Sequence, residues 1–120
     1  MSNVPLDFNR MQVNGWTVLS SVYDRVEICL ANNDVLEQVV RGLIGSGHRR
    51  IVIDLSRVEF MDSSAHRVLV DATKKLSAQS GGLRIVITDG GMRDTLEIIG
   101  VAQLLNIYSA VSIATLKTPS

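Results

Sequence analysis

A chain of 120 residues has the length of one domain, and 46% hydrophobic residues with a mean hydropathy of +0.22 suffice for one packed core. Twelve basic and twelve acidic residues cancel, so the chain lacks the basic excess that a nucleic-acid-binding protein uses against phosphates. No apolar stretch approaches the roughly 18 residues of a membrane span, and the first residues lack the pattern of a secretory signal. We therefore expect one cytoplasmic domain over residues 1–120, with no membrane segment and no direct contact with nucleic acid.

The first half of the chain alternates between strand and helix patterns. Strands are expected over about 6–13, after the turn Asn14-Gly15 over 16–19, and over 26–30. A helix follows the capping residues 32–34, with Asp34 and Glu37 spaced as a capping box, and ends at the glycines of residues 45–47. Residues 51–55 are almost continuously apolar and β-branched, which is typical of a strand buried on both faces of a parallel sheet.

The second half continues the alternation. A helix is expected over 63–80, stopped by two glycines, then a strand over 83–88 and a helix over 92–99 ended by Gly100. Residues 104–108 form a last strand or an extended segment, and 111–116 a short closing helix. The pattern predicts an α/β fold with a mixed, mostly parallel central sheet and about four helices packed against it. The core spans about 6–116, and residues 117–120 form a loose tail.

Two serines stand at the predicted start of the long helix, in Asp62-Ser63-Ser64. The first N–H groups of a helix lack partners within it, so Asp62 or Ser63 can cap them, and the same end attracts a phosphate. Ala65 begins an apolar stripe at helical spacing, which places Ser64 towards the exposed side and leaves Ser63 as a cap or partly covered. Capping alone explains two such serines in most proteins. The stripe continues through Leu69, Ala72 and Leu76, and Arg67 and Asp71 are spaced to pair on another face.

The cysteine and the histidines of this sequence are not spaced like the residues of a catalytic or metal-binding site. Cys29 lies between apolar neighbours, so a buried and inert thiol is expected. Ser64 and His66 are two apart on a helix and point in different directions, which argues against a catalytic pair. His66 and His48 are expected at or near the surface, too far apart for a metal site. We expect no enzymatic activity, no cofactor and no metal.

Taken together, three segments resemble the STAS domain family of anti-sigma factor antagonists. Residues 54–64 match its strand, connection and aspartate-serine-serine turn, although the family's next glycine is Ala65 here. Residues 81–86 resemble its next helix-to-strand junction, and residues 96–101 its later helix end. The similarity covers roughly residues 16–116.

The resemblance implies a protein-interaction switch. In the family, the second serine of the motif, here Ser64, is phosphorylated by an anti-sigma factor that is also a serine kinase. The unmodified antagonist binds that factor and releases a sigma factor, and a serine phosphatase resets the cycle. The expected contact surface comprises Asp62, Ser63, Ser64, Ala65 and Arg67. Alternative roles are a scaffold subunit of a stress-signalling complex, with other STAS proteins as partners, or an accessory subunit of a lipid transporter.

Overall fold

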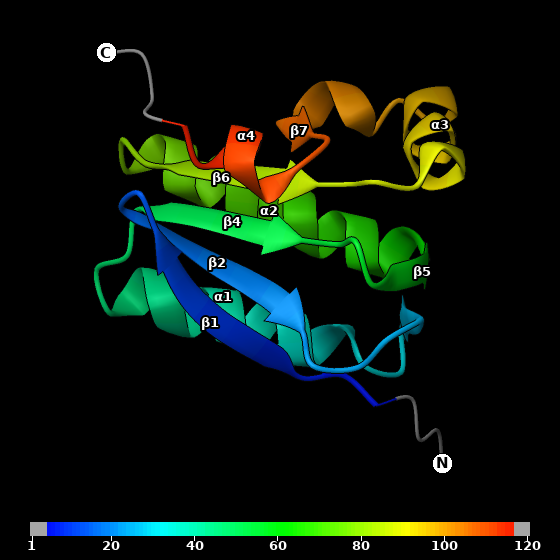
Figure 1. The fold of residues 1–120 in the computed structure, drawn as a ribbon, viewed down its shortest axis with the longest axis horizontal. Coiled ribbons are helices and arrows are strands. Elements are labelled where there is room, and N and C mark those ends of the chain that lie inside the picture. Colours follow the sequence, from blue (N-terminus) through cyan, green and yellow to red (C-terminus); the bar gives the residue numbers. More distant parts are fainter. Residues whose placement is uncertain (1–4, 117–120) are drawn as a thin grey trace.

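The structure, a computed structural model that describes residues 5–116, contains seven strands within that range. They are β1 (Phe8–Val13), β2 (Trp16–Ser21), β3 (Val26–Ile28), β4 (Arg50–Asp54), β5 (Val58–Met61), β6 (Gly82–Val86) and β7 (Ile107–Tyr108). Five of them form the central sheet in the order β1-β2-β4-β6-β7 (Figure 1), and β3 pairs with β5 in a small second sheet. Only β1 and β2 are antiparallel, so the predicted mixed and mostly parallel sheet is confirmed.

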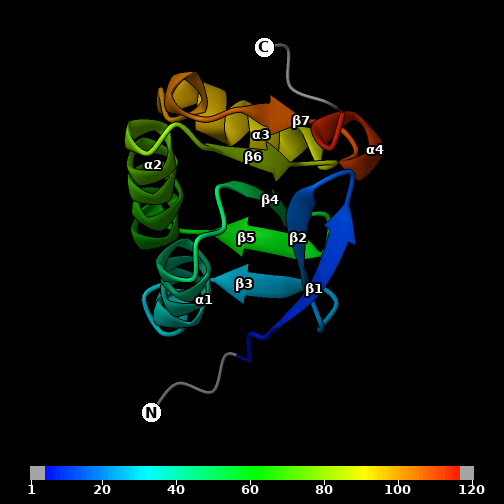
Figure 2. The same cartoon turned by 90° about the vertical axis from the view of Figure 1, so that its left-hand side faces the viewer.

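The same residues contain four α-helices and a short 3-10 helix. They are α1 (Asn33–Gly45), α2 (Ser63–Ala78), α3 (Gly90–Ile98) and α4 (Val111–Ala114), with the 3-10 helix at Ala102–Leu104. Figure 2 shows α1 and α2 together on one side of the central sheet and α4 on the other. The prediction of about four helices is confirmed. The tail predicted at residues 117–120 lies outside the described residues.

Apolar side chains cover both faces of the central sheet, which explains the continuous apolar run of its inner strands. On the side of α1 and α2, Leu19, Ile53 and Ile85 align across three strands and are completely buried. On the opposite side, Val52 belongs to a second buried cluster that includes Ala114 of α4. Burying one such aliphatic side chain stabilises the fold by about 1.5–3 kcal/mol. The small α4 therefore completes the core on a face that the long helices do not reach.

The turn from α2 to β6 depends on a close backbone approach. Ser80 has a φ of +60°, a left-handed conformation that costs free energy for any residue other than glycine. The N–H of Gly82 donates to the carbonyl of Arg49 at 2.8 Å, which aligns β6 with the start of β4. A Cβ on Gly81 would lie 2.3 Å from that same Arg49 oxygen. The two glycines therefore do more than end the helix, because one of them leaves room for the neighbouring strand.

Strand β5 was not predicted, since the residues between the buried strand and the long helix read as a brief connection. The segment is short, and its Glu59 and Phe60 are both exposed, so it lacks the alternation that identifies a strand. It becomes a strand because it pairs with β3, about thirty residues earlier in the chain.

The predicted start of α1 is only partly correct. Asn32 occupies the position before the helix, but its side chain makes no cap hydrogen bond. Its Oδ1 instead accepts from the N–H of Cys29 at 2.8 Å, and its Nδ2 donates to the carbonyl of Glu27 at 2.8 Å. The capping box of Asp34 and Glu37 is therefore wrong, because Asp34 already lies inside the helix. The prediction of a buried Cys29 is also wrong, since this residue is half-buried in the loop after β3.

Candidate functional site

Asp62 determines where α2 begins. Its backbone is extended, and its Oδ1 accepts hydrogen bonds from the N–H groups of Ser64 at 3.0 Å and Ala65 at 3.1 Å. These bonds satisfy two of the N–H groups that the first turn of a helix leaves without partners. Of the two capping candidates, Asp62 is therefore the cap and Ser63 is not.

The same carboxylate connects α2 with the loop after β3. The second oxygen of Asp62, Oδ2, accepts from the N–H of Leu30 at 2.9 Å. In addition, the N–H of Asp62 donates to the carbonyl of Ile28 at 3.2 Å. Residues that are about thirty positions apart in the sequence therefore form one continuous surface around the start of α2.

The two serines differ in exposure, in the opposite sense to the prediction. Ser63 is exposed, whereas Ser64 is half-buried and its hydroxyl donates to Oδ1 of Asp62 at 2.5 Å. Helical spacing predicts the direction of the Cα–Cβ bond, but the short Ser64 side chain turns back to the capping carboxylate. The hydrogen bond from the Ser64 hydroxyl is the main reason why the pKa of Asp62 lies below its usual value. Backbone N–H groups act in the same direction, while partial burial opposes them.

His66 is buried, which corrects the prediction of a surface or flanking position. Only 7% of its surface is exposed, and its Nδ1 has no hydrogen-bond partner among the described residues. Burial lowers the pKa of His66, and the negative charge of Asp62 partly opposes this shift. The ring lines a cavity of about 240 Å³ between β5 and the start of α3, together with Met61 and Met92. The Ser64 hydroxyl therefore bonds to Asp62 and not to His66.

Arg67 is exposed on α2, one turn after Asp62. Its predicted ion pair with Asp71 is absent from the ion pairs found within residues 5–116. Those pairs are Arg25–Glu59, Glu37–Arg41 and Arg93–Glu97. The Arg67 guanidinium is therefore available to a partner protein at this surface.

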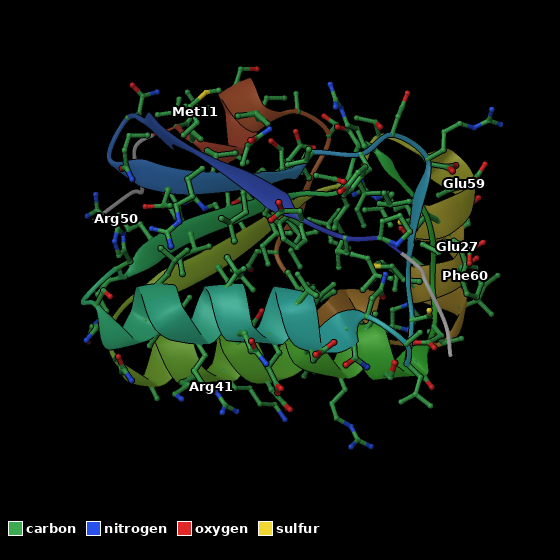
Figure 3. All side chains as sticks on the ribbon, turned by 90° about the horizontal axis from the view of Figure 1, so that it is seen from below. Met11, Glu27, Arg41, Arg50, Glu59 and Phe60 are labelled. Atoms are coloured by element: carbon green, nitrogen blue, oxygen red, sulfur yellow. The ribbon has the colours of Figure 1, made fainter. Side chains whose placement is uncertain are left out.

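Two exposed apolar residues that the sequence did not single out lie near the serines. Leu30, whose N–H is bound by Asp62, is 79% exposed, and Phe60 on β5 is 52% exposed. Figure 3 shows Phe60 at the same end of the molecule as Glu27 and Glu59. Leu30 and Phe60 therefore add exposed apolar area to the end of the molecule where α2 begins. The sequence placed Leu30 inside a strand, so nothing in the pattern marked it as exposed.

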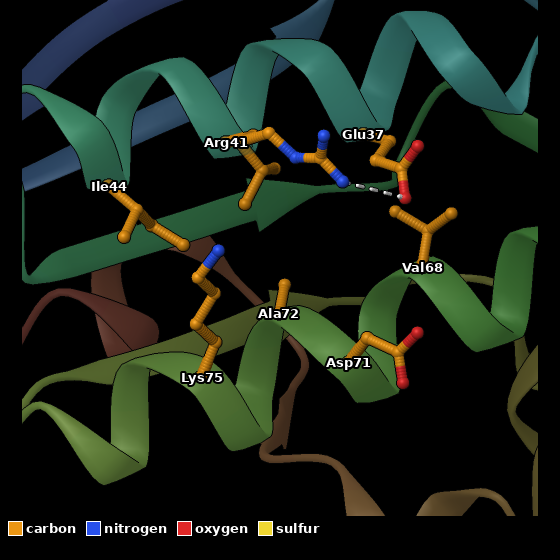
Figure 4. A pocket seen from close by; sticks show the side chains of 8 residues that line it. Glu37, Arg41, Ile44, Val68, Asp71, Ala72 and Lys75 are labelled. Atoms are coloured by element: carbon orange, nitrogen blue, oxygen red, sulfur yellow. Dashed lines mark ion pairs between the residues drawn. The ribbon is translucent and has the colours of Figure 1, made fainter.

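A groove of about 150 Å³ lies between α1 and α2 (Figure 4). Its floor is apolar, and its rim carries Glu37 and Arg41 of α1, paired at 3.7 Å, opposite Asp71 and Lys75 of α2. Because charges of both signs alternate along this rim, we interpret the groove as the solvent-exposed boundary between two packed helices.

No group of three or more His, Cys, Asp and Glu side chains in residues 5–116 is arranged to hold a metal ion. None of the helices in this range is long and apolar enough to cross a bilayer.

The sequence of the chain matches the family model of the STAS domain over residues 22–114. The chain belongs to the STAS domain family. BtrV of Bordetella bronchiseptica, provisionally named an anti-sigma factor antagonist, is 28% identical over 80 residues, which are 67% of this chain and 69% of BtrV.

Solved structures of STAS proteins share the fold. The crystal structure of an anti-sigma factor antagonist from Mycobacterium paratuberculosis has a TM-score of 0.81 at 23% identity, covering 94% of this chain and 93% of that one. SpoIIAA, a cell-fate determinant of Bacillus, is known in its unphosphorylated and phosphorylated forms. Their TM-scores are 0.66 and 0.65, both at 16% identity, and each covers 91% of this chain, against 92% and 96% of SpoIIAA. These likenesses show that the whole described domain has the STAS fold.

Proposed function

We propose that this protein is an anti-sigma factor antagonist that binds an anti-sigma factor with serine kinase activity and is switched off by phosphorylation of Ser64. One observation carries the proposal: the Ser64 hydroxyl is held by the capping carboxylate of Asp62 on a surface that also presents an exposed Leu30. The provisional name of BtrV and the phosphorylated form of SpoIIAA support the same role. A serine phosphatase would restore the binding form.

The unmodified surface offers the features of a protein-binding site. Leu30 provides exposed apolar area, Ser63 an exposed hydroxyl and Arg67 an exposed cation, all around the start of α2. Asp62 holds the loop and the helix together, so little order is gained or lost when a partner binds. A preorganised surface of this kind binds without the entropic cost of ordering a loop. Ala65 lies beneath it, completely buried, and supports the first turn.

Phosphorylation would change the charge at the centre of this surface. A phosphate on Ser64 adds about −1.5 to −2 charges at neutral pH and removes the hydroxyl proton that now binds Asp62. Asp62 already occupies the N–H groups of the first turn, so the phosphate and the carboxylate compete for them and repel each other. If burying this pair in the interface costs ~3 kcal/mol, the complex weakens by roughly a hundredfold.

The test is intact-mass spectrometry after incubation with ATP and candidate kinase anti-sigma factors from the same organism. We expect one added phosphate that is lost in Ser64→Ala and kept in Ser63→Ala, which is the matched control on the neighbouring exposed hydroxyl. In a binding assay with the same factor, Ser64→Ala should bind like the wild type, and Ser64→Asp should bind more weakly.

Three results would contradict the proposal. Loss of the phosphate in Ser63→Ala alone would move the switch to the more exposed serine. Equal binding by wild type, Ser64→Ala and Ser64→Asp would show that the serine does not control the complex. Self-association in gel filtration, without binding to any candidate factor, would favour the scaffold role instead.

A further inference from the structure

Basic side chains gather at one end of the fold of this neutral chain. The end where the parallel strands finish and α2 begins carries charges of both signs, since Glu59 pairs there with Arg25 and Arg67 is exposed nearby. The opposite end, where β4 and β6 begin and α2 finishes, carries basic residues, and Figure 3 places Arg50 there. Those basic residues are Arg49, Arg50, Lys74, Lys75 and Arg84. Net charge alone therefore concealed a positive region on the side away from Ser64.

A cavity of about 280 Å³ opens within this basic end. It is formed by residues of four neighbouring strands, β2, β4, β6 and β7, and by the turn from α2 to β6. Its walls come from Trp16, Arg50, Ser80, Gly81, Gly82, Arg84, Asn106 and Tyr108. Two of these lining residues are arginines and none is acidic, so the cavity favours a negatively charged ligand.

Arg84 is a rigid part of the wall. Its guanidinium carbon lies 4.3 Å from the centre of the Trp16 ring and 5.2 Å from that of Tyr108. Its Nη1 also donates to the carbonyls of Ala114 at 3.0 Å and Leu116 at 3.1 Å. A positive charge fixed between two rings and the end of α4 needs no rearrangement to attract an anion.

Two further groups of the wall can contact a ligand. Arg50 is exposed at the start of β4 and has no acidic partner within residues 5–116, so its planar donors can bind two oxygens of one anion. Ser80 contributes an exposed hydroxyl from the turn. The wall also contains an unsatisfied donor, because the indole N–H of the buried Trp16 has no partner among the described residues.

We propose that this cavity binds the phosphate group of a small ligand, with Arg50 as the principal contact and Arg84 as a fixed positive charge. The cavity, of about 280 Å³, is large enough to hold a phosphate monoester such as a sugar phosphate. The site lies at the end of the domain opposite Ser64. The proposal therefore does not rest on the proposed phosphorylation switch, and its test uses the unmodified protein.

Trp16 is the only tryptophan of the sequence and lines the cavity, so its fluorescence reports binding directly. The wild type would be titrated with inorganic phosphate and with ribose 5-phosphate, with chloride adjusted to keep the ionic strength constant. We expect a saturable change that weakens at least tenfold in Arg50→Gln and changes less than twofold in Lys74→Gln. Lys74 is the matched control, because it is an exposed cation at the same end that does not line the cavity.

A second arm separates the two sources of such a phosphate group. Cosedimentation with vesicles that contain phosphatidic acid, whose headgroup is a phosphate monoester, would identify a lipid headgroup as the ligand if the free phosphates do not bind and the cosedimentation is lost in Arg50→Gln. Binding of the free phosphates would identify a soluble ligand. The proposal is overturned if neither binds, if chloride alone produces the same fluorescence change, or if Arg50→Gln binds like the wild type while circular dichroism shows it folded.

Discussion

Replacing Asp62 by alanine tests how this single carboxylate organises the site. The substitution removes the acceptor of the Ser64 and Ala65 N–H groups, and losing a helix N-cap costs about 1 kcal/mol. It also removes the acceptor of the Leu30 N–H, a bond to a charged group at the surface, for which we add about 1 kcal/mol. We expect Asp62→Ala to lower the free energy of unfolding by about 2 kcal/mol.

Urea unfolding followed by Trp16 fluorescence measures this change. With an m-value of about 1.5–2 kcal/mol/M for a chain of this size, the midpoint should fall by roughly 1 M. Asp62→Asn is the matched control, because asparagine caps helices as well as aspartate does, and it should lose less than about half as much. A loss below about 0.5 kcal/mol in Asp62→Ala, or an equal loss in Asp62→Asn, would refute the assignment of Asp62 as a structural cap.

The structure also predicts how the contribution of Asp62 to the free energy of unfolding changes at acidic pH. Since hydrogen bonds lower the pKa of Asp62, the unfolded chain binds a proton at this residue before the folded protein does. The stabilisation is complete above the unfolded value of about 3.9 and is lost as the pH falls through the lower folded value. Asp62→Asn should therefore lose less stability between pH 5 and pH 2 than the wild type. If the free energies of unfolding of both proteins fall equally over this range, the assigned hydrogen bonds are contradicted.

Three further substitutions test the turn from α2 to β6 and the burial of His66. Gly81→Ala should destabilise the protein by more than about 2 kcal/mol, because the added Cβ would lie 2.3 Å from the Arg49 carbonyl oxygen. A melting temperature equal to that of the wild type would contradict this close approach. Ser80→Gly should raise the free energy of unfolding by about 0.5–1 kcal/mol in the urea assay, since glycine adopts a φ of +60° without the steric cost that serine has. A lower free energy of unfolding would argue against that backbone conformation. Burial lowers the pKa of His66, so the unfolded state binds the proton first below about pH 6.5 and stability falls. His66→Leu should thus be less sensitive than the wild type in thermal melts between pH 7 and pH 5, and an unchanged pH dependence would show that His66 is not responsible.

Much of the architecture could be predicted because its signals are local. The start of α2 follows from Asp62 and the apolar stripe behind it, in which Ala65, Leu69, Ala72 and Leu76 are all buried as predicted. The strand at residues 51–55 could be recognised since β-branched residues occupy both of its faces. Capping and periodicity act within a few residues, so a single sequence contains the information needed to place these elements.

The details of the site depended on contacts between distant segments. Asparagine at residue 32 and aspartate at residue 62 are both good capping residues, yet only Asp62 caps, because Asn32 is occupied by the end of β3. Similarly, His66 was expected at the surface or at the flank of the apolar stripe, but its ring is buried and lines the cavity between β5 and α3. Neither outcome is visible in the spacing, since both depend on which strand lies beside the helix.

The sequence by itself determined the class of fold, the order of its main elements and the serine pair at the start of α2, for these follow from local periodicity and capping. Only the tertiary structure decided that β3 and β5 pair, that Leu30 is exposed beside Asp62 and that Ser63 is the more exposed of the two serines. It also decided that basic residues of this neutral chain gather around one cavity at one end of the fold. The physical reason is that pairing, burial and the summed electrostatic field depend on distances in space, which the order of residues along a chain does not specify.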